Sequence, residues 1–382
     1  MSKKDLADVC NYMKALVIPD MPDGFRVADK FRHGLTDREI RKGVGAYRGF
    51  LYALFDKLAA DKDKIDLKTR DNYNPYVKSD RTNIRMCLPV IVDLAMILFT
   101  LGIRGRLDME GKRLAVRVDD LLTVICEKTE NYISLIKMSG GRKFEMFRIL
   151  TDLGLGFEGV DFSREVDFSK VEEFSVTYAA DDFFVAGLKL LAEATANHRD
   201  YYYVMNMFGV LLECDFYPLA NEKPKKRVRD INLSSGGQAT EIREWIAEMD
   251  GYLLSNGCTL GGSWEFTYAL RKVKNRKGMV LRVWMDITGC YACPGVNHLD
   301  RPDSIVSMLP GEIVEMLKTQ RECGWCSQPD PAKCSRGGPF GFTHDGGEYV
   351  RCRTAEFRID LSDAGNRDLV RQWVEMELAA SA

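Results

Sequence analysis

The cysteines of this 382-residue chain are unevenly distributed, and their distribution limits what the last third of the chain can fold into. Four of the eleven are scattered through the first two thirds. The other seven crowd the last third, at Cys258, Cys290, Cys293, Cys323, Cys326, Cys334 and Cys352. The N-terminal sequence MSKKDLADVCNYMK is charged and lacks the apolar core of a signal peptide, so we expect a cytoplasmic protein with reduced thiols. These cysteines then serve packing, metal binding or redox chemistry.

Two CxxC pairs, Cys290-Tyr-Ala-Cys293 and Cys323-Gly-Trp-Cys326, are separated by 29 residues. Each tight turn can direct two thiolates at one tetrahedral zinc ion. The second pair lies in a loop rich in proline and glycine, which has little apolar content to fold by itself, so a metal would supply the missing stability. We predict a structural zinc ion on Cys323, Cys326, Cys334 and Cys352.

Other uses of the cysteines stay open. An alternative zinc set combines Cys290 and Cys293 with the second CxxC pair, and His298 or His344 could replace a cysteine. The second CxxC pair could instead be a reactive redox pair. A redox CxxC normally opens a helix after a strand, whereas here residues 312–320 predict a helix before the motif and proline and glycine follow it. The structural zinc site is therefore the favoured interpretation.

A basic segment followed by Ser-Ser-Gly-Gly interrupts the chain at residues 218–237. Such a composition is typical of a linker between domains. It predicts a mainly helical α+β region over residues 1–217 and a cysteine-rich α+β domain over residues 238–382. The fold class is therefore α+β, with an antiparallel sheet in the C-terminal domain.

The N-terminal region contains one clear helix and a possible internal repeat. Thr36 and Glu39 have the spacing of a capping box, which predicts a helix from residue 37 to about residue 60. Two helix ends of sequence Leu-Gly, at Gly102 and Gly154, predict glycines in left-handed conformation. Each precedes a strand, at residues 114–118 and 174–178, then Asp-Asp and a further apolar helix. The pattern indicates a duplicated helix–strand–helix unit over residues 80–200.

The C-terminal domain shows a helix, a hairpin and a last helix. Thr240 is a candidate cap for a helix that ends near residue 255, and residues 368–378 predict the last helix. Residues 264–270 and 279–287 alternate between apolar and polar side chains, and the charged segment between them, which closes on a glycine, predicts a hairpin.

One face of the second hairpin strand is a candidate ligand-binding surface. Arg282, Trp284 and Asp286 alternate with apolar residues and therefore share a face. In one register the partner strand adds Glu265 and Thr267 to that face, and in the other it adds Trp264 and Tyr268. Aromatic and charged side chains together suit a small planar or cationic ligand. The competing interpretation is a solvent-exposed face with one aromatic side chain. The candidate ligand-binding residues are Glu265, Arg282, Trp284 and Asp286.

Several classes of protein find little support. A formal charge of −2 and a pI near 6.2 give no whole-chain attraction for nucleic acid or anionic membranes. The apolar segment 86–101 is shorter than a bilayer crossing and contains Pro89 and Asp93, so it predicts a buried helix. Gly154-Leu-Gly-Phe-Glu-Gly159 matches the dinucleotide-binding pattern, but a helix precedes it and strand-like residues follow, so we expect a turn.

The sequence therefore predicts a cytoplasmic ligand-binding or regulatory protein with a structural zinc site in its C-terminal domain. An alternative is a small-molecule enzyme with an active site between the domains, using Glu265, Asp286 or a CxxC thiolate. A third class is a nucleic-acid-binding protein that uses winged-helix-like N-terminal units. Its candidate contacts are Arg104, Arg106, Lys112 and Arg113.

Overall fold

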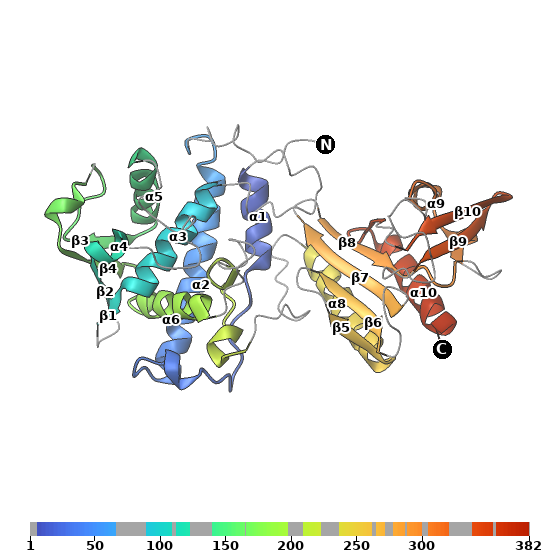
Figure 1. The fold of residues 1–382 in the computed structure, drawn as a ribbon, viewed down its shortest axis with the longest axis horizontal. Helices are drawn as coiled ribbons and strands as arrows, with labels where there is room; N and C mark the ends of the chain where they lie inside the picture. The colour runs from blue at the N-terminus through green and yellow to red at the C-terminus, as the bar shows by residue number, and fades with distance from the viewer. Residues whose placement is uncertain are drawn as a thin grey trace. The chain divides into compact units, whose positions relative to one another are not determined.

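The structure is a computed structural model that describes most of the chain (Figure 1). The described part comprises residues 6–65, 89–108, 112–122, 140–164, 166–197, 209–222, 237–261, 265–271, 278–286, 289–299, 305–320, 338–353 and 357–381. It has a mainly helical N-terminal region and antiparallel sheets, which confirms the predicted α+β class.

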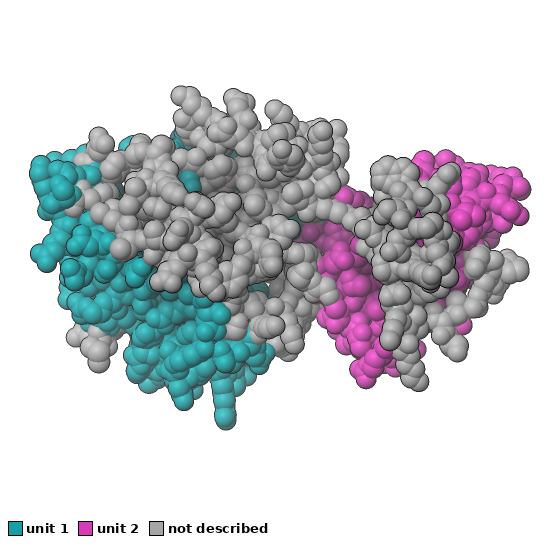
Figure 2. All heavy atoms as spheres, in the orientation of Figure 1, with its two compact units in different colours: residues 1–225 teal, residues 226–382 magenta. Residues whose placement is uncertain are grey.

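The chain divides into two compact units, residues 1–225 (unit 1) and residues 226–382 (unit 2), which Figure 2 colours separately. The division falls inside the basic segment that we predicted to be a linker. The first residues of that segment belong to unit 1, because Pro218 is buried in the 3-10 helix η6 (Tyr217–Ala220).

Unit 1 is organised around a buried helix, α6 (Phe184–Asn197), which packs against α2 (Asp37–Ala60) and α3 (Pro89–Arg104). α2 also packs against α1 (Leu6–Leu16). The predicted capping box is present at the start of α2: the Thr36 hydroxyl accepts a hydrogen bond from the Glu39 amide, and the Glu39 carboxylate accepts one from the Thr36 amide. The predicted start and end of this helix are confirmed.

A four-stranded antiparallel sheet completes unit 1, in the order β1-β2-β4-β3. Its strands are β1 (Arg106–Leu107), β2 (Leu114–Arg117), β3 (Leu155–Glu158) and β4 (Glu173–Tyr178). Two further helices, α4 (Val118–Leu122) and α5 (Gly140–Asp152), give the element order α3-β1-β2-α4 followed by α5-β3-β4-α6. The same order of elements thus occurs twice, with an antiparallel strand pair where the sequence predicted one strand.

One of the two predicted helix ends is wrong. Gly102 lies inside α3, which continues to Arg104. A Cβ atom at Gly102 would lie 2.9 Å from the Leu188 carbonyl oxygen, so glycine is required there for close packing against α6. Gly154 does follow α5 with a φ of +96°, and β3 begins at the next residue. The GxGxxG match therefore begins at a helix end, as predicted, but its residues between Gly154 and Gly159 form strand β3 where we expected a turn.

Unit 2 is built on a five-stranded antiparallel sheet in the order β11-β8-β7-β6-β5. The strands are β5 (Cys258–Gly261), β6 (Phe266–Leu270), β7 (Met279–Asp286), β8 (Gly289–Pro294) and β11 (Ile359–Asp360). The remaining elements are α8 (Gly237–Ser255), α9 (Gly311–Lys318), α10 (Ala364–Ser381) and the hairpin of β9 (Pro339–His344) and β10 (Gly347–Cys352). The predicted hairpin of β6 and β7 is confirmed. The predicted cap at Thr240 is wrong, because α8 already begins at Gly237.

Helix α8 covers one face of this sheet. The Tyr268 hydroxyl on β6 donates a hydrogen bond of 2.8 Å to the Asp250 carboxylate on α8. Tyr268 is paired with Leu281 on β7, and residues paired directly across strands share a face. The side chains that alternate with Leu281, among them Arg282 and Trp284, therefore lie on the opposite face.

Candidate functional site

Strand register brings the predicted ligand-binding residues together on the face of the unit 2 sheet that α8 does not cover. Thr267 is paired with Arg282, and Trp284 is paired with Tyr291 on β8. Glu265 precedes β6 on the same face, two residues from Thr267. The structure thus has the register that places Glu265 and Thr267 beside Arg282. The side chain of Asp286, at the end of β7, lies outside the described part.

Cations and aromatic rings alternate across this face. The Arg282 guanidinium lies 5.2 Å from the centre of the Trp284 ring and 3.6 Å from the Glu265 carboxylate. The Arg358 guanidinium lies 5.9 Å from the Trp284 ring and 5.6 Å from the Tyr291 ring. The two rings are 6.0 Å apart. Both guanidinium groups lie within cation–π range of the Trp284 ring, so the indole makes cation–π contacts with two arginines.

The face is not a solvent-exposed one. Arg282 is 4% exposed and Trp284 is 9% exposed, although the sequence also allowed a solvated surface with one aromatic side chain. The indole Nε1–H of Trp284 is buried, and no residue of the described part accepts a hydrogen bond from it. A buried donor without an acceptor costs about 1–3 kcal/mol. The sequence did not reveal Arg358, because β11 has only two residues and gives no recognisable periodicity.

The predicted zinc ligands fall mostly outside the described part, which contains Cys352 but neither Cys323, Cys326 nor Cys334. Within the described part, no group of three histidine, cysteine or acidic residues is arranged to hold a metal ion. Cys352 is buried at the end of β10. The residues on either side of Cys352 form hydrogen bonds with Lys318 and Gly338, which flank the segment that contains the other three cysteines. Arg351 Nε donates to the Lys318 carbonyl oxygen at 2.8 Å, and the Arg353 amide donates to the Gly338 carbonyl oxygen at 3.2 Å.

The other CxxC pair lies on a regular strand. Cys290 and Cys293 are both in β8, three positions apart, and side chains at that spacing point to opposite faces of a sheet. Cys293 is paired with Arg282 and Cys290 with Met285, which confirms that they lie on different faces. Both are buried. This geometry does not direct the two thiols at one ion.

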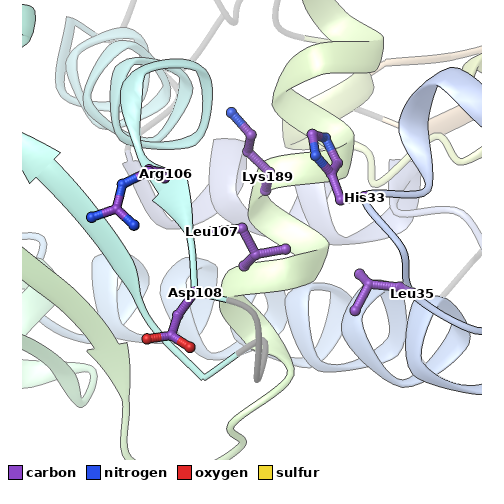
Figure 3. Close-up of a pocket in the computed structure, with 6 residues that line it drawn as sticks. All are labelled: His33, Leu35, Arg106, Leu107, Asp108 and Lys189. Atoms are coloured by element: carbon purple, nitrogen blue, oxygen red, sulfur yellow. The ribbon is translucent and has the colours of Figure 1, made fainter.

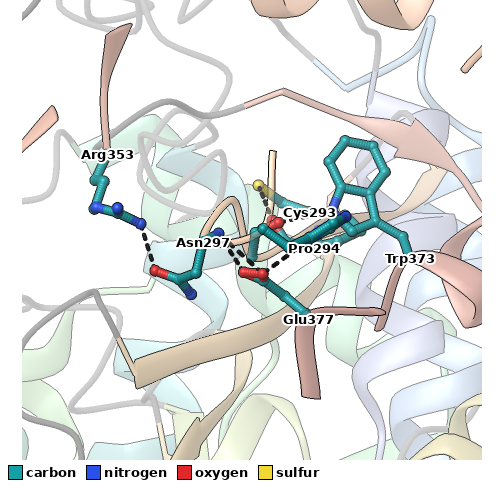
Figure 4. Close-up of polar contacts among 8 residues, drawn as sticks. Cys293, Pro294, Asn297, Arg353, Trp373 and Glu377 are labelled. Carbon is teal, nitrogen blue, oxygen red and sulfur yellow. Dashed lines mark hydrogen bonds and ion pairs between the residues drawn. The ribbon is translucent and has the colours of Figure 1, made fainter. Parts of the chain in front are cut away.

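A buried imidazole–carboxylate pair lies elsewhere in unit 2, and Figure 4 shows its carboxylate, Glu377, beside Asn297. Glu377 of α10 is 0% exposed and His298 is 2% exposed, with Nδ1 of the histidine 3.1 Å from Oε2 of the glutamate. The carboxylate also accepts a hydrogen bond from the Asn297 amide, and the Asn297 side chain accepts one from Arg353. His298 Nε2 is buried and has no hydrogen-bond partner in the described part. An imidazole oriented by a carboxylate in this way is typical of metal-binding histidines.

Glu377 was missed in the sequence, although a signal was present. Val370, Trp373 and Val374 form the buried stripe of α10, and Glu377 follows at the next helical step. A charged residue on a buried stripe requires a partner, since an isolated buried charge is strongly unfavourable. The pattern therefore indicated a buried polar contact, but not that His298 would make it.

No family model, no curated protein and no solved structure matches this chain. None of the described helices has both the length and the apolar character needed to cross a membrane. The enzyme with an active site between the two units stays a prediction, as does the reactive thiol pair. The nucleic-acid interface stays one as well. Of its four residues, Arg113 pairs with Asp108 at 2.9 Å and Arg106 lines a pocket.

Proposed function

We propose that the protein is a cytoplasmic ligand-binding protein in which the Trp284 face of unit 2 receives a planar anionic ligand. The observation that carries the proposal is the buried indole Nε1–H of Trp284, which has no acceptor in the described part and lies beside two guanidinium groups. A ligand oxygen atom would accept this hydrogen bond and remove the cost of the unpaired donor.

Among the side chains that the structure describes on this face, the charges favour an anion. Arg282 and Arg358 contribute two positive charges next to the Trp284 and Tyr291 rings, and Glu265 contributes one negative charge to Arg282. Guanidinium groups bind carboxylate and phosphate in a planar, two-pronged geometry, and the aromatic rings stack on planar groups. The sequence pointed to a planar or cationic ligand, and the second arginine is the reason to prefer an anionic one.

The substitution Trp284→Phe tests this proposal, because it keeps a smaller aromatic ring and removes the N–H donor. With benzoate and adenosine monophosphate as probes in calorimetric titrations, we expect at least one to bind the wild type and the variant to bind it at least about tenfold more weakly. Trp245→Phe is the matched control, since Trp245 on α8 also has a buried Nε1 without an acceptor in the described part but lies on the helix covering the other face.

Equal affinity in wild type and Trp284→Phe would show that the indole N–H does not contact the probe. Equal loss in both tryptophan variants would show a general effect on unit 2. Absence of binding by both probes, together with a higher melting temperature of Trp284→Phe, would mean that the unpaired donor is a packing defect. Each of these results would contradict a ligand site at Trp284.

We further propose that unit 2 is stabilised by a structural zinc ion on Cys323, Cys326, Cys334 and Cys352. The position of Cys352 supports this set, because its neighbours bind Lys318 and Gly338, which flank the segment that contains the other three cysteines. The opposite orientation of Cys290 and Cys293 argues against the alternative set. The buried, unpartnered Nε2 of His298 supports the histidine as the alternative fourth ligand.

Metal content separates the two choices for the fourth ligand. Protein purified without chelator should carry one zinc ion per chain by mass spectrometry. Cys352→Ser should lose the ion if Cys352 is the fourth ligand, whereas His298→Asn should lose it if the histidine is. Zinc-free wild-type protein would overturn the zinc proposal without affecting the Trp284 proposal.

A further inference from the structure

A pocket in unit 1 lies apart from every residue that the sequence suggested as a ligand or metal site. It has a volume of about 250 Å³ and is lined by His33, Leu35, Arg106, Leu107, Asp108 and Lys189 (Figure 3). Three elements build it: the turn before α2 contributes the histidine, α6 contributes the lysine, and the edge strand β1 with the following residue contributes Arg106, Leu107 and Asp108.

Lys189, which lines the pocket, forms an ion pair with the partly buried Glu193. Lys189 and Glu193 are the two charged residues of the otherwise apolar helix α6, and Lys189 is 8% exposed. The Lys189 ammonium lies 3.1 Å from the Glu193 carboxylate and donates to the Ile103 carbonyl oxygen at 3.2 Å. An ammonium group has three N–H donors. Two of them have acceptors in the described part of the chain, so the third can bind a ligand.

Glu193 also holds the histidine. Nε2 of His33 lies 2.6 Å from the second oxygen of the Glu193 carboxylate. His33 has a φ of +50° and Gly34 has a φ of +78°, so the backbone turns sharply to bring the ring to this place. A left-handed conformation costs a residue with a side chain about 1–2 kcal/mol. The contact with Glu193 helps to hold this strained turn at the mouth of the pocket.

The lining carries a net positive charge. Lys189 is balanced by Glu193, and Asp108 is balanced by Arg113 at 2.9 Å. Arg106 forms no ion pair with any residue of the described part, and its guanidinium is exposed. Arg106 therefore leaves one positive charge unbalanced among these residues. A ligand with a negative charge would neutralise it.

We propose that this pocket binds a small oxyanion, either a phosphate group or a carboxylate, through Lys189 and His33, with Arg106 supplying the unbalanced positive charge of the lining. Its volume of about 250 Å³ suits a small molecule or a single charged group. Lys189 is buried and fixed by Glu193, so it offers an oriented positive charge. Arg106 lines the pocket from the edge strand, with its guanidinium directed away from Lys189 and His33 (Figure 3).

The test is calorimetric titration of the full chain with inorganic phosphate and, separately, with acetate, at constant ionic strength set with sodium chloride. We expect saturable binding by at least one probe. Lys189→Met and Arg106→Gln should each weaken it at least tenfold. Lys57→Met is the matched control, because Lys57 on α2 also pairs with a carboxylate four residues later, Asp61, but does not line the pocket.

The two probes distinguish the source of the oxyanion. Saturation by phosphate alone identifies a phosphate ester or free phosphate, and saturation by acetate alone identifies a carboxylate; both support the site. If Lys189→Met does not fold, the exposed Arg106→Gln still decides. The proposal fails if neither probe binds, or if Lys57→Met weakens binding as much as the two pocket variants do.

Discussion

Glu377 has no exposed surface in unit 2, and its carboxylate contacts the Asn297 amide and the His298 ring. Replacing one oxygen of this buried carboxylate by an NH2 group removes the charge and sets a donor against a donor. We expect Glu377→Gln to lower the free energy of unfolding of unit 2 by about 3 kcal/mol. Thermal denaturation followed by near-ultraviolet circular dichroism measures the effect.

Glu375 gives a control on the same helix, because it is exposed. Glu375→Gln should change the stability by less than about 0.5 kcal/mol. Equal melting temperatures for Glu377→Gln and Glu375→Gln would show that the buried carboxylate contributes nothing to stability.

Tyr268 links the stability of unit 2 to pH. Burial, together with the hydrogen bond to Asp250, raises the pKa of the Tyr268 hydroxyl well above its ordinary value. A group whose pKa is higher in the folded state than in the unfolded state stabilises the fold fully at pH values below its unfolded-state pKa, which for tyrosine is about 10. This contribution to stability is lost as the pH rises above that value. The unfolding free energy of unit 2 should therefore fall by about 1.4 kcal/mol per pH unit above pH 10 through this group.

Urea denaturation at several pH values measures this slope. Tyr268→Phe should be less stable at pH 7, because it lacks the hydrogen bond to Asp250, but should lose less stability between pH 10 and pH 11. An unchanged slope in this variant would assign the alkaline loss to other groups.

Single residues show which parts of the candidate sites could be predicted from the sequence. Arg282 and Trp284 were predictable as one face because strand alternation is local, and Glu265 required only the choice between two registers. The contacts of Arg358 and Glu377 were not predictable, since each depends on a partner far away in the chain. His33 gave no signal, because its role depends on the path of a turn beside a helix 160 residues later.

At the scale of the element, helices α2 and α6 cross at two glycines. A Cβ atom on Gly43 would lie 2.8 Å from the Gly187 amide nitrogen and 2.9 Å from the Phe183 carbonyl oxygen, and one on Gly187 would overlap the Gly43 carbonyl group. Backbone atoms cannot rotate away as a side chain can. We expect Gly187→Ala to destabilise unit 1 by about 3 kcal/mol and to lower its melting temperature by roughly 10 °C.

The same helix supplies the control. Gly45 lies on the exposed side of α2, where a Cβ atom would meet nothing within 4 Å. Gly45→Ala should stabilise unit 1 by about 0.5–1 kcal/mol, because alanine favours the helix and restricts the unfolded chain. Destabilisation by Gly45→Ala as well would contradict this account, because alanine is the better helix former and no close contact opposes it at that position.

Elements with a local signal were predicted well, and elements that depend on packing were not. The capping box fixed the start of α2, and alternation fixed β2, β4 and β7. The two-residue strands β1 and β11 have no periodicity of their own and exist through pairing with a neighbour. Gly102 resembled a helix end, but its contact with α6 decides its role, and that contact lies outside any local window.

At the scale of the whole molecule, the division at residues 225 and 226 implies two cores that can unfold separately. Calorimetry should then show two transitions. Gly187→Ala should lower only the transition of unit 1, and Glu377→Gln should lower only that of unit 2, which assigns each transition to its unit. A single transition that shifts in both variants would contradict separate unfolding.

The proposed zinc ion should change the unfolding transition of unit 2 and leave that of unit 1 unchanged. Zinc binding free energy is folding free energy for the segment that it organises, so a chelator should lower the temperature of the unit 2 transition only.

Six of the eleven cysteines, namely Cys10, Cys214, Cys258, Cys290, Cys293 and Cys352, are buried in the described part. Burial raises the pKa of the Cys214 thiol, which reduces its reactivity further.

Thiol counts should follow the metal. If zinc is bound as proposed, a thiol reagent added to native protein should react with at most Cys87 and Cys126. After chelation it should also react with the three cysteines between Lys318 and Gly338. Cys352 should react as a fourth if loss of zinc unfolds unit 2. Released zinc and newly reactive thiols should therefore appear together, in a ratio of one to three or four. Five reactive thiols before chelation, with an unchanged unit 2 transition after it, would show that unit 2 folds without zinc and would leave the CxxC pair to redox chemistry.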